Sequence, residues 1–165
     1  MIEIRQIDPD DWKLLRATRL AALQDAPEAF ESTYEGSLAF GEEEWRRRAG
    51  RHPVFLAFTG EEPVGIAVGL HDEGTRPDSR DLVSMWVSPA VRGQGVAGRL
   101  IDAIVNWARA DGARELHLWV VVGNAAARAA YDRAGFIATG EQQPVRGHGN
   151  RVEERMVLAL DRLTA

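Results

Sequence analysis

The chain has 165 residues, of which 45% are hydrophobic and 27% charged, and its formal net charge at pH 7 is −5. This length suits a single domain over residues 1–165. The absence of cysteine excludes disulfides, thiolate metal ligands and a cysteine nucleophile. No run of about 18 apolar residues could span a bilayer, and no signal-peptide pattern opens the chain. We therefore expect a cytoplasmic protein without a membrane partner.

Acidic residues gather in the first half of the chain. Residues 1–80 hold 16 acids and 10 bases, whereas residues 81–165 hold 9 acids and 10 bases. A negative overall field argues against a nucleic-acid partner and favours a cationic acceptor such as an amine. Solubility alone explains the same imbalance equally well.

Hydrophobic periodicity and turn residues predict alternating strands and helices. An aspartate N-cap followed by a proline begins the first helix, and glutamates placed before arginines complement the dipole of a later one. In chain order we expect a strand at 2–7, a helix from 8 to about 24, a short helix or turn over 27–34, a helix at 42–51, hairpin strands at 54–59 and 64–70, a polar loop at 71–80, a strand at 82–87, a helix from 96 to about 111, a strand at 115–122, a short helix at 124–134, and last strands at 136–140 and 152–160, joined by a loop over 142–150. This mixture of hairpins and crossovers implies an α/β sheet of mixed direction.

The most informative segment is the glycine-rich turn between the strand at 82–87 and the helix that follows it. The first amides of a helix have no intrahelical partner, and the helix dipole favours an anion beside them. Gly93 and Gly95 carry no side chain that would obstruct a close approach, and Arg92 and Arg99 can add positive charge. The turn is therefore predicted to bind phosphate.

The same glycines also match a dinucleotide-binding fingerprint, G-x-G-x-x-G, at Gly93, Gly95 and Gly98. A Rossmann-type dinucleotide-binding protein is therefore one alternative. That fold sets its glycines directly after the strand and needs an acidic residue at the end of the next strand. Here residues 88–92 intervene, and the strand at 115–122 is followed by glycine and asparagine, so both requirements are unmet.

Two motifs resemble those of the GCN5-related N-acetyltransferase (GNAT) family. Residues 92–97 read R-x-x-G-x-A, which is similar to the R/Q-x-x-G-x-G/A turn that binds the pyrophosphate of acetyl-coenzyme A (acetyl-CoA) in that family. Residues 124–136 begin with Asn, followed seven residues later by Tyr and then by Gly-Phe, as in the family's second signature. The two motifs occur in the expected order and separation, and the resemblance extends over essentially the whole chain.

The resemblance implies both a fold and a reaction. The fold is a mixed central sheet of six to seven strands flanked by about four helices. The reaction moves an acetyl group from acetyl-CoA, a co-substrate, to a primary amine of a small molecule or protein, directly in a ternary complex and without a metal. A non-catalytic module that binds or senses acyl-CoA is the alternative. Homodimers are common in the family, and the sequence leaves the oligomeric state, the acceptor and the acyl chain open.

The resemblance also implies which residues bind acetyl-CoA. Backbone groups of Met85 and Val87 are expected beside the pantetheine arm, which would lie like an added strand. Asn124 is expected to bond the pantetheine, and Arg133 is available to the nucleotide end. The pyrophosphate is assigned to the turn formed by Arg92, Gly93, Gln94, Gly95, Val96 and Ala97.

Catalytic roles follow from the same resemblance. Tyr131 is the implied acid, because the family places a tyrosine hydroxyl near the thioester sulfur from this position. Some relatives carry a glutamate base five residues before the motif asparagine, but here that position is Trp119. This departure argues against a ribosomal-protein type of N-terminal acetyltransferase. Asp81 lies near where other relatives hold a catalytic carboxylate and is the candidate base.

The acceptor side is marked more weakly. Residues 25–34 follow the first helix and correspond to an acceptor wall in the family, and a glutamate on the last strand could line the same side. The candidates for acceptor binding are Phe30, Tyr34 and Glu154. The four histidines are scattered without ligand spacing, so no metal site is expected.

Overall fold

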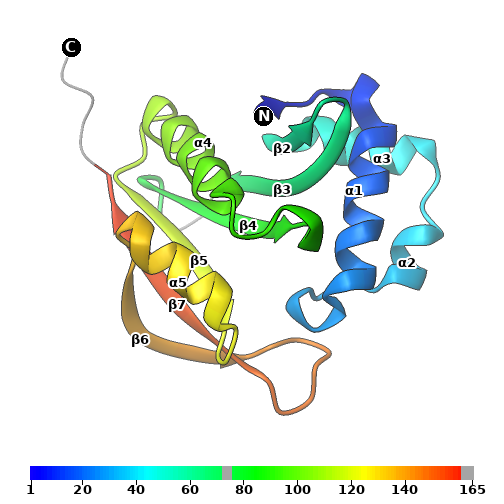
Figure 1. The fold of residues 1–165 in the computed structure, drawn as a ribbon. Coiled ribbons are helices and arrows are strands. Elements are labelled where there is room, and N and C mark those ends of the chain that lie inside the picture. The colour runs from blue at the N-terminus through cyan, green and yellow to red at the C-terminus, as the bar shows by residue number, and fades with distance from the viewer. Residues whose placement is uncertain (72–75, 161–165) are drawn as a thin grey trace. The chain divides into compact units, whose positions relative to one another are not determined.

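The computed structural model describes residues 1–71 and 76–160, which form seven strands and five α-helices (Figure 1). The strands are β1 (Ile2–Gln6), β2 (Val54–Thr59), β3 (Glu62–His71), β4 (Ser79–Val87), β5 (Glu115–Val121), β6 (Ile137–Pro144) and β7 (Val152–Ala159). The α-helices are α1 (Trp12–Asp25), α2 (Tyr34–Leu38), α3 (Glu42–Arg51), α4 (Val96–Ala110) and α5 (Ala125–Ala134). Single 3₁₀ turns occur at η1 (Pro9–Asp11), η2 (Pro27–Ala29) and η3 (Pro89–Val91).

The strands form one sheet in the order β1-β2-β3-β4-β5-β7-β6. β4 pairs in parallel with β5, whereas the pairs β1–β2, β2–β3, β5–β7 and β6–β7 are antiparallel. The expected sheet of mixed direction is therefore confirmed. A Rossmann sheet is mostly parallel, so this topology does not fit the dinucleotide-binding alternative.

The described residues group into two compact units. Unit 1 contains Met1–Val68 and Ser84–Ala103, and unit 2 contains the described residues of Gly69–Val83 and Ile104–Ala165. β3, β4 and α4 each contribute residues to both units. The expectation of a single domain over residues 1–165 stays a prediction.

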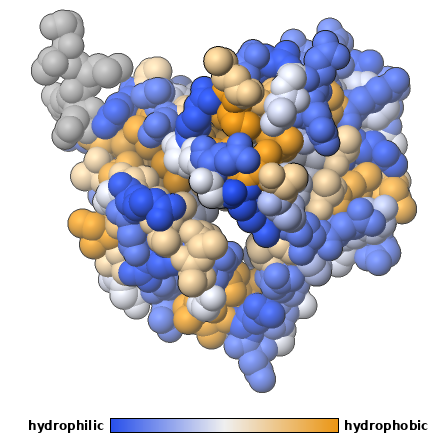
Figure 2. All heavy atoms as spheres, viewed as in Figure 1, coloured by the Kyte–Doolittle hydropathy of each residue, from blue (hydrophilic) through white to orange (hydrophobic). Residues whose placement is uncertain are grey.

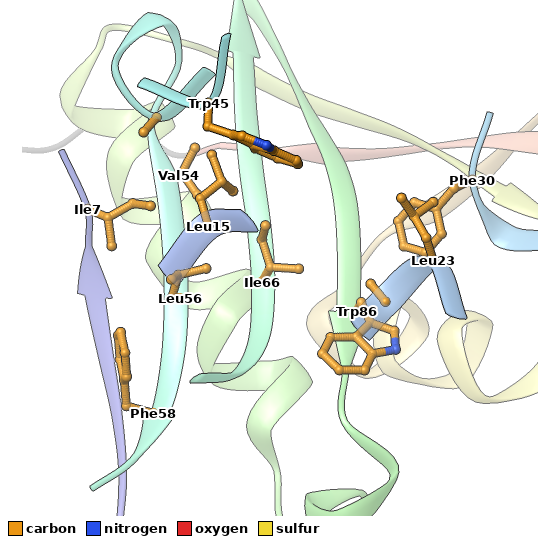
Figure 3. Close-up of a cluster of buried hydrophobic side chains, with 12 residues drawn as sticks. Ile7, Leu15, Leu23, Phe30, Trp45, Val54, Leu56, Phe58, Ile66 and Trp86 are labelled. Carbon is orange, nitrogen blue, oxygen red and sulfur yellow. The ribbon is translucent and has the colours of Figure 1, made fainter. Parts of the chain in front are cut away.

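Unit 1 is built around one apolar cluster that joins helices and strands distant in the sequence. Leu15 and Leu23 of α1, Trp45 of α3 and Leu56 of β2 are each at most 4% exposed. Figure 3 shows these side chains with Phe30, Ile66 and Trp86 in the same cluster. Burying each large apolar side chain contributes about 1.5–3 kcal/mol, so this cluster fixes α1 and α3 against the strands of unit 1.

Unit 2 has a core of its own beneath α5. Leu116 and Leu118 of β5 and Met156 of β7 are at most 1% exposed. A Cβ atom added at Gly135, just after α5, would lie 3.3 Å from Leu158 of β7, so the end of this helix packs closely on that strand. The buried Arg80 of β4 is fixed by two bonds to Asp111, one to a carboxylate oxygen and one to the carbonyl, both 2.8 Å long.

The structure corrects two expected boundaries and adds one helix. The short helix or turn expected over 27–34 is present as the 3₁₀ turn at 27–29, and a separate helix follows at 34–38, where the hydroxyl of Thr33 accepts a bond from the Gly36 amide and caps it. β4 already begins at Ser79, inside the expected loop, part of which lies outside the described residues. β6 continues to Pro144, and its exposed, polar sequence gives no hydrophobic period by which the extension could have been predicted.

Hydrophilic side chains occupy much of the face shown in Figure 2, with apolar residues between them. In the part of the chain that the structure describes, no helix has both the length and the apolar character needed to cross a membrane.

Candidate functional site

The glycine-rich turn of unit 1 has the backbone geometry that a phosphate cradle requires. Gly93 and Gly95 have φ angles of +83° and +78°, in the left-handed region that favours glycine. A Cβ atom at either position would meet nothing within 4 Å, so open space lies beside the backbone. The carbonyl of Gly95 accepts the first helical bond, from Arg99 at 3.2 Å, which leaves the amides of residues 96–98 without intrahelical acceptors.

The side chains of Arg92 and Arg99 are bonded within unit 1. Arg92 forms an ion pair of 2.5 Å with Asp25 at the end of α1, and it donates a bond of 3.1 Å to the carbonyl of Val87. Arg99 donates to the carbonyl of Ile2. The positive charge of the turn is thus partly neutralised, and the backbone amides remain its clearest anion-binding groups.

Asp25 also joins the turn to the core. The carboxylate oxygen that pairs with Arg92 accepts a bond of 3.0 Å from the indole N–H of Trp86, which is only 7% exposed. One oxygen therefore connects the end of α1, the last part of β4 and the turn.

The end of β4 carries a backbone irregularity next to the residues expected beside pantetheine. Ser84 has φ +57°, a rare conformation for a residue other than glycine. Met85 and Val87 follow it and are half buried. β4 pairs with β5 at Ser79–Asp81, upstream of this irregularity.

Within unit 1, Phe30 lies on the segment that links α1 to α2, and Tyr34 is the first residue of α2. Phe30 is buried in the apolar cluster, and Tyr34 packs against that cluster while remaining partly exposed. The guanidinium of Arg19 lies 5.0 Å from the centre of the Phe30 ring. Sequence reasoning missed Arg19, because nothing in its local sequence distinguishes it from Arg16, the other arginine of α1.

In unit 2, the second motif has a structural explanation at both ends of α5. The carboxamide oxygen of Asn124 accepts a bond of 3.3 Å from the Ala127 amide, so this residue caps the helix. Gly135 ends the helix with φ +100°, and the Phe136 amide donates a bond of 3.1 Å to the carbonyl of Tyr131. This is the bonding pattern of a Schellman motif, which explains the Gly-Phe pair.

The same motif holds the ring of Tyr131. Its ring centre lies 5.8 Å from that of Phe136, with an angle of 64° between the planes, and the tyrosine is 5% exposed. Burial raises the pKa of the Tyr131 hydroxyl, because it disfavours the charged phenolate. The hydroxyl is therefore protonated at neutral pH and can act as a donor. Arg133, two residues later, is exposed.

The candidate carboxylates of unit 2 have different surroundings. Asp81 of β4 is half buried and pairs in register with His117 of β5. Glu154 of β7 forms an ion pair with Arg128 of α5, which gives this carboxylate a structural role in fixing the helix to the strand. Glu153, beside it, accepts a bond of 2.7 Å from Gln143 of β6.

Sequence reasoning also missed a partly buried set of polar contacts across β5, β6 and β7. Arg155 donates a bond of 2.9 Å to Nδ1 of His117, which is 5% exposed, and the other ring nitrogen lies 3.0 Å from a carboxylate oxygen of Glu115. Because arginine only donates, Nδ1 accepts and the proton sits on Nε2. Arg155 also pairs with Glu141. The contacts join residues up to 38 positions apart, so no local motif marks them.

No group of three or more histidines, aspartates or glutamates in the described ranges is arranged to hold a metal ion.

Comparison with known proteins identifies the family. The model of the acetyltransferase (GNAT) family matches residues 15–136. The chain belongs to the GNAT acetyltransferase family, as the two sequence motifs predict.

Individual relatives cover different shares of the chain. A mycothiol acetyltransferase of Corynebacterium glutamicum is 36% identical over 84 residues, which are 50% of this chain and 27% of that protein's length. A GNAT-family acetyltransferase from Streptococcus pneumoniae has a similar structure, with a TM-score of 0.84 and 21% identity over 98% of this chain and 100% of that one. A putative acetyltransferase from Salmonella typhimurium, solved with its cofactor acetyl-CoA, gives a TM-score of 0.77 and 22% identity over 100% and 97%. The structural matches confirm the GNAT fold.

Proposed function

We propose that this chain is an N-acetyltransferase that moves the acetyl group of acetyl-CoA directly to the amine of a small molecule or protein. The observation that carries this proposal is the turn of unit 1, where Gly93 and Gly95 adopt left-handed backbone conformations at the start of α4. Family membership and the acetyl-CoA bound by the Salmonella typhimurium neighbour support the choice of donor. A cytoplasmic location stays a prediction from the sequence.

We assign the binding of the diphosphate and pantetheine of acetyl-CoA to residues of unit 1. The amides of residues 93–98 can donate to phosphate oxygens, and the dipole of α4 favours the negative charge there. The irregular backbone at Ser84 supports a role for the following residues, Met85 and Val87, in pairing with the pantetheine, because a strand that departs from its ladder has free backbone groups to offer.

Unit 2 is assigned the proton donor and further donor contacts. In the proposed step, the amine nitrogen attacks the thioester carbonyl carbon, the carbon–sulfur bond breaks, and the hydroxyl of Tyr131 gives its proton to the departing thiolate. Because burial raises its pKa, the hydroxyl of Tyr131 holds a proton at neutral pH, as a donor must, but the same shift lowers the driving force for its transfer to a thiolate. Asn124 is proposed to bond the pantetheine and Arg133 to meet the nucleotide end.

The proton lost by the amine must go to a base or to water, because only a neutral amine can attack. Asp81 is the proposed base, and Phe30, Tyr34 and Glu154 are proposed to line the acceptor side. Replacing Asp81 by Asn is expected to remove the basic group from the pH–rate profile. A variant that keeps the wild-type profile would move this role to water or to another residue.

The deciding experiment measures release of the coenzyme A thiol from acetyl-CoA with a library of amines. Turnover is expected with wild-type protein, and Tyr131→Phe is expected to lower kcat by about tenfold or more while the KM for acetyl-CoA changes little. Equal turnover by the variant at every pH would remove the acid role. Binding of acetyl-CoA without thiol release for any amine would favour the non-catalytic binding or sensing module.

A further inference from the structure

Arg19 of α1 is a half-buried cation without a carboxylate partner. Its Nη1 donates a bond of 2.7 Å to the hydroxyl of Ser84, and its Nη2 donates one of 3.3 Å to the hydroxyl of Ser32. The ring of Phe30 lies 5.0 Å away but carries no net charge. Over residues 1–71 and 76–160, no carboxylate lies within ion-pair distance of this guanidinium. All of its partners belong to unit 1.

Such an arrangement is energetically unusual. A buried charge is normally paired, as the buried Arg80 of unit 2 is with Asp111. Burial, followed by the positive charge of Arg48, lowers the pKa of Arg19 to about 10. The guanidinium is still charged at neutral pH, so an uncompensated positive charge remains among largely neutral neighbours.

The two serines extend this positive group with further donors. A guanidinium has no acceptor, so each serine oxygen must accept from Arg19. Because each hydroxyl accepts through its oxygen, its hydrogen can donate to another group. A planar guanidinium matches the two oxygens of a carboxylate, and a hydroxyl beside it adds a second type of donor.

The backbone of Ser84 strengthens the case for a binding role. Its φ of +57° is strained for a residue other than glycine, and such strain occurs often at ligand-binding sites. Here the conformation accompanies a 2.7 Å contact between the Ser84 hydroxyl and Arg19. Ser84 directly precedes Met85, the residue proposed to lie beside the pantetheine, and Phe30 belongs to the proposed acceptor wall.

We propose that Arg19, Ser32 and Ser84 bind the carboxylate of a small amino acid, whose amine is the acetyl acceptor. This inference rests on the proposed function, because it assigns the acceptor class of the same site. Net charge alone favours a cationic acceptor, whereas the local surroundings of Arg19 select an acceptor that carries both an amine and an anionic group.

The test uses matched pairs of acceptors with the full-length chain. Thiol release is measured at saturating acetyl-CoA for each common L-amino acid and for its carboxamide, which keeps the amine and removes the negative charge. We expect kcat/KM to be at least about tenfold higher for the preferred acid than for its amide, because tenfold corresponds to only about 1.4 kcal/mol and charged hydrogen bonds commonly supply that.

Variants then assign the preference to residues. Arg19→Gln is expected to raise the KM for the acid at least tenfold, to change kcat/KM for the amide less than about twofold, and to leave the KM for acetyl-CoA unchanged. Lys13→Gln, an exposed site on the same helix, is the control for the lost charge. Ser32→Ala is expected to raise the KM for the acid severalfold. This variant tests the carboxylate site if Arg19→Gln does not fold.

A second measurement does not depend on turnover. Thermal unfolding with each amino acid at about 10 mM is expected to show a higher Tm for the wild type, and no such shift for Arg19→Gln. Equal kcat/KM for acids and amides, equal losses for both in Arg19→Gln, or no Tm shift with any acid would overturn the carboxylate site. Turnover of amides or simple amines alone would also overturn the carboxylate site, but it would leave the proposed function intact. Hydrolysis or binding of acetyl-CoA without acetylation of any acceptor would contradict the proposed function itself.

Discussion

Replacing Asp25 by Ala tests how the turn is joined to the core. One oxygen of this carboxylate accepts from the indole N–H of Trp86 at 3.0 Å and from Arg92 at 2.5 Å. The Trp86 ring is 7% exposed, so losing its acceptor leaves a buried donor unsatisfied, at about 1–3 kcal/mol. Arg92 is 52% exposed, so its ion pair adds only about 0–1 kcal/mol. We expect a total destabilisation of about 2 kcal/mol.

This loss corresponds to a fall in Tm of about 4–8 °C for a chain of this length. The assay is thermal and urea unfolding followed by circular dichroism and tryptophan fluorescence. Arg92→Gln, which removes only the exposed partner, is expected to lower Tm by about 1–2 °C, and Asp25→Asn keeps an oxygen for Trp86 and is expected to fall between the two. Arg92→Gln as destabilising as Asp25→Ala would refute the reasoning, because the buried indole would then contribute nothing.

Three further changes test the turn, the second motif and the pH response. Gly95→Val is expected to raise the KM for acetyl-CoA at least about tenfold. The control, Gly60→Val, imposes similar left-handed strain at φ +62° and is expected to leave this KM unchanged. An equal rise in KM for both variants would point to strain alone. Gly135→Ala is expected to cost about 1–2 kcal/mol in urea unfolding, since φ is +100° and Leu158 lies 3.3 Å from the new Cβ, and a neutral result would contradict the tight end of α5. Bonds from two arginines lower the pKa of Glu44 from 4.5 to about 2, so its contribution to stability is full above the unfolded value and is lost as the pH falls through the folded one. The difference in Tm between wild type and Glu44→Gln is therefore expected to shrink between pH 4.5 and about 2, and a constant difference would show that the carboxylate charge is not responsible.

Local signals allowed much of the fold to be predicted from the sequence. The helix at 42–51 was placed correctly because its acids and bases match the helix dipole, and the glycine turn because its residues are adjacent in the chain. The helix α2 was not predicted as a separate element, because one hydroxyl, that of Thr33, determines where it starts. The strand predicted at 136–140 was shorter than β6, because an exposed edge strand has no apolar alternation that would mark its full length.

Contacts between distant residues could not be predicted. Asp25 and Arg92 are 67 positions apart, and Arg19 and Ser84 are 65 apart. The positive φ of Ser84 has no sequence signature either, since serine in a strand is ordinarily extended. The residues that form the turn could thus be predicted from the sequence. The contacts around Arg19 that define the proposed acceptor site could not.

Two arginines of unit 1 show why the surroundings matter more than the residue type. Arg92 belongs to a recognised motif, yet its charge is paired with Asp25, so this side chain helps to hold the turn in place. Arg19 belongs to no motif, yet its side chain bonds two hydroxyls and lies beside an aromatic ring. Residues 1–80 hold 16 acids and 10 bases, yet no described carboxylate lies within ion-pair distance of Arg19. The negative net charge acts at long range and favours the approach of a cationic amine. Specificity depends on the local surroundings of one guanidinium, which favour a negative carboxylate. An amino acid carries both groups, so the two preferences are compatible.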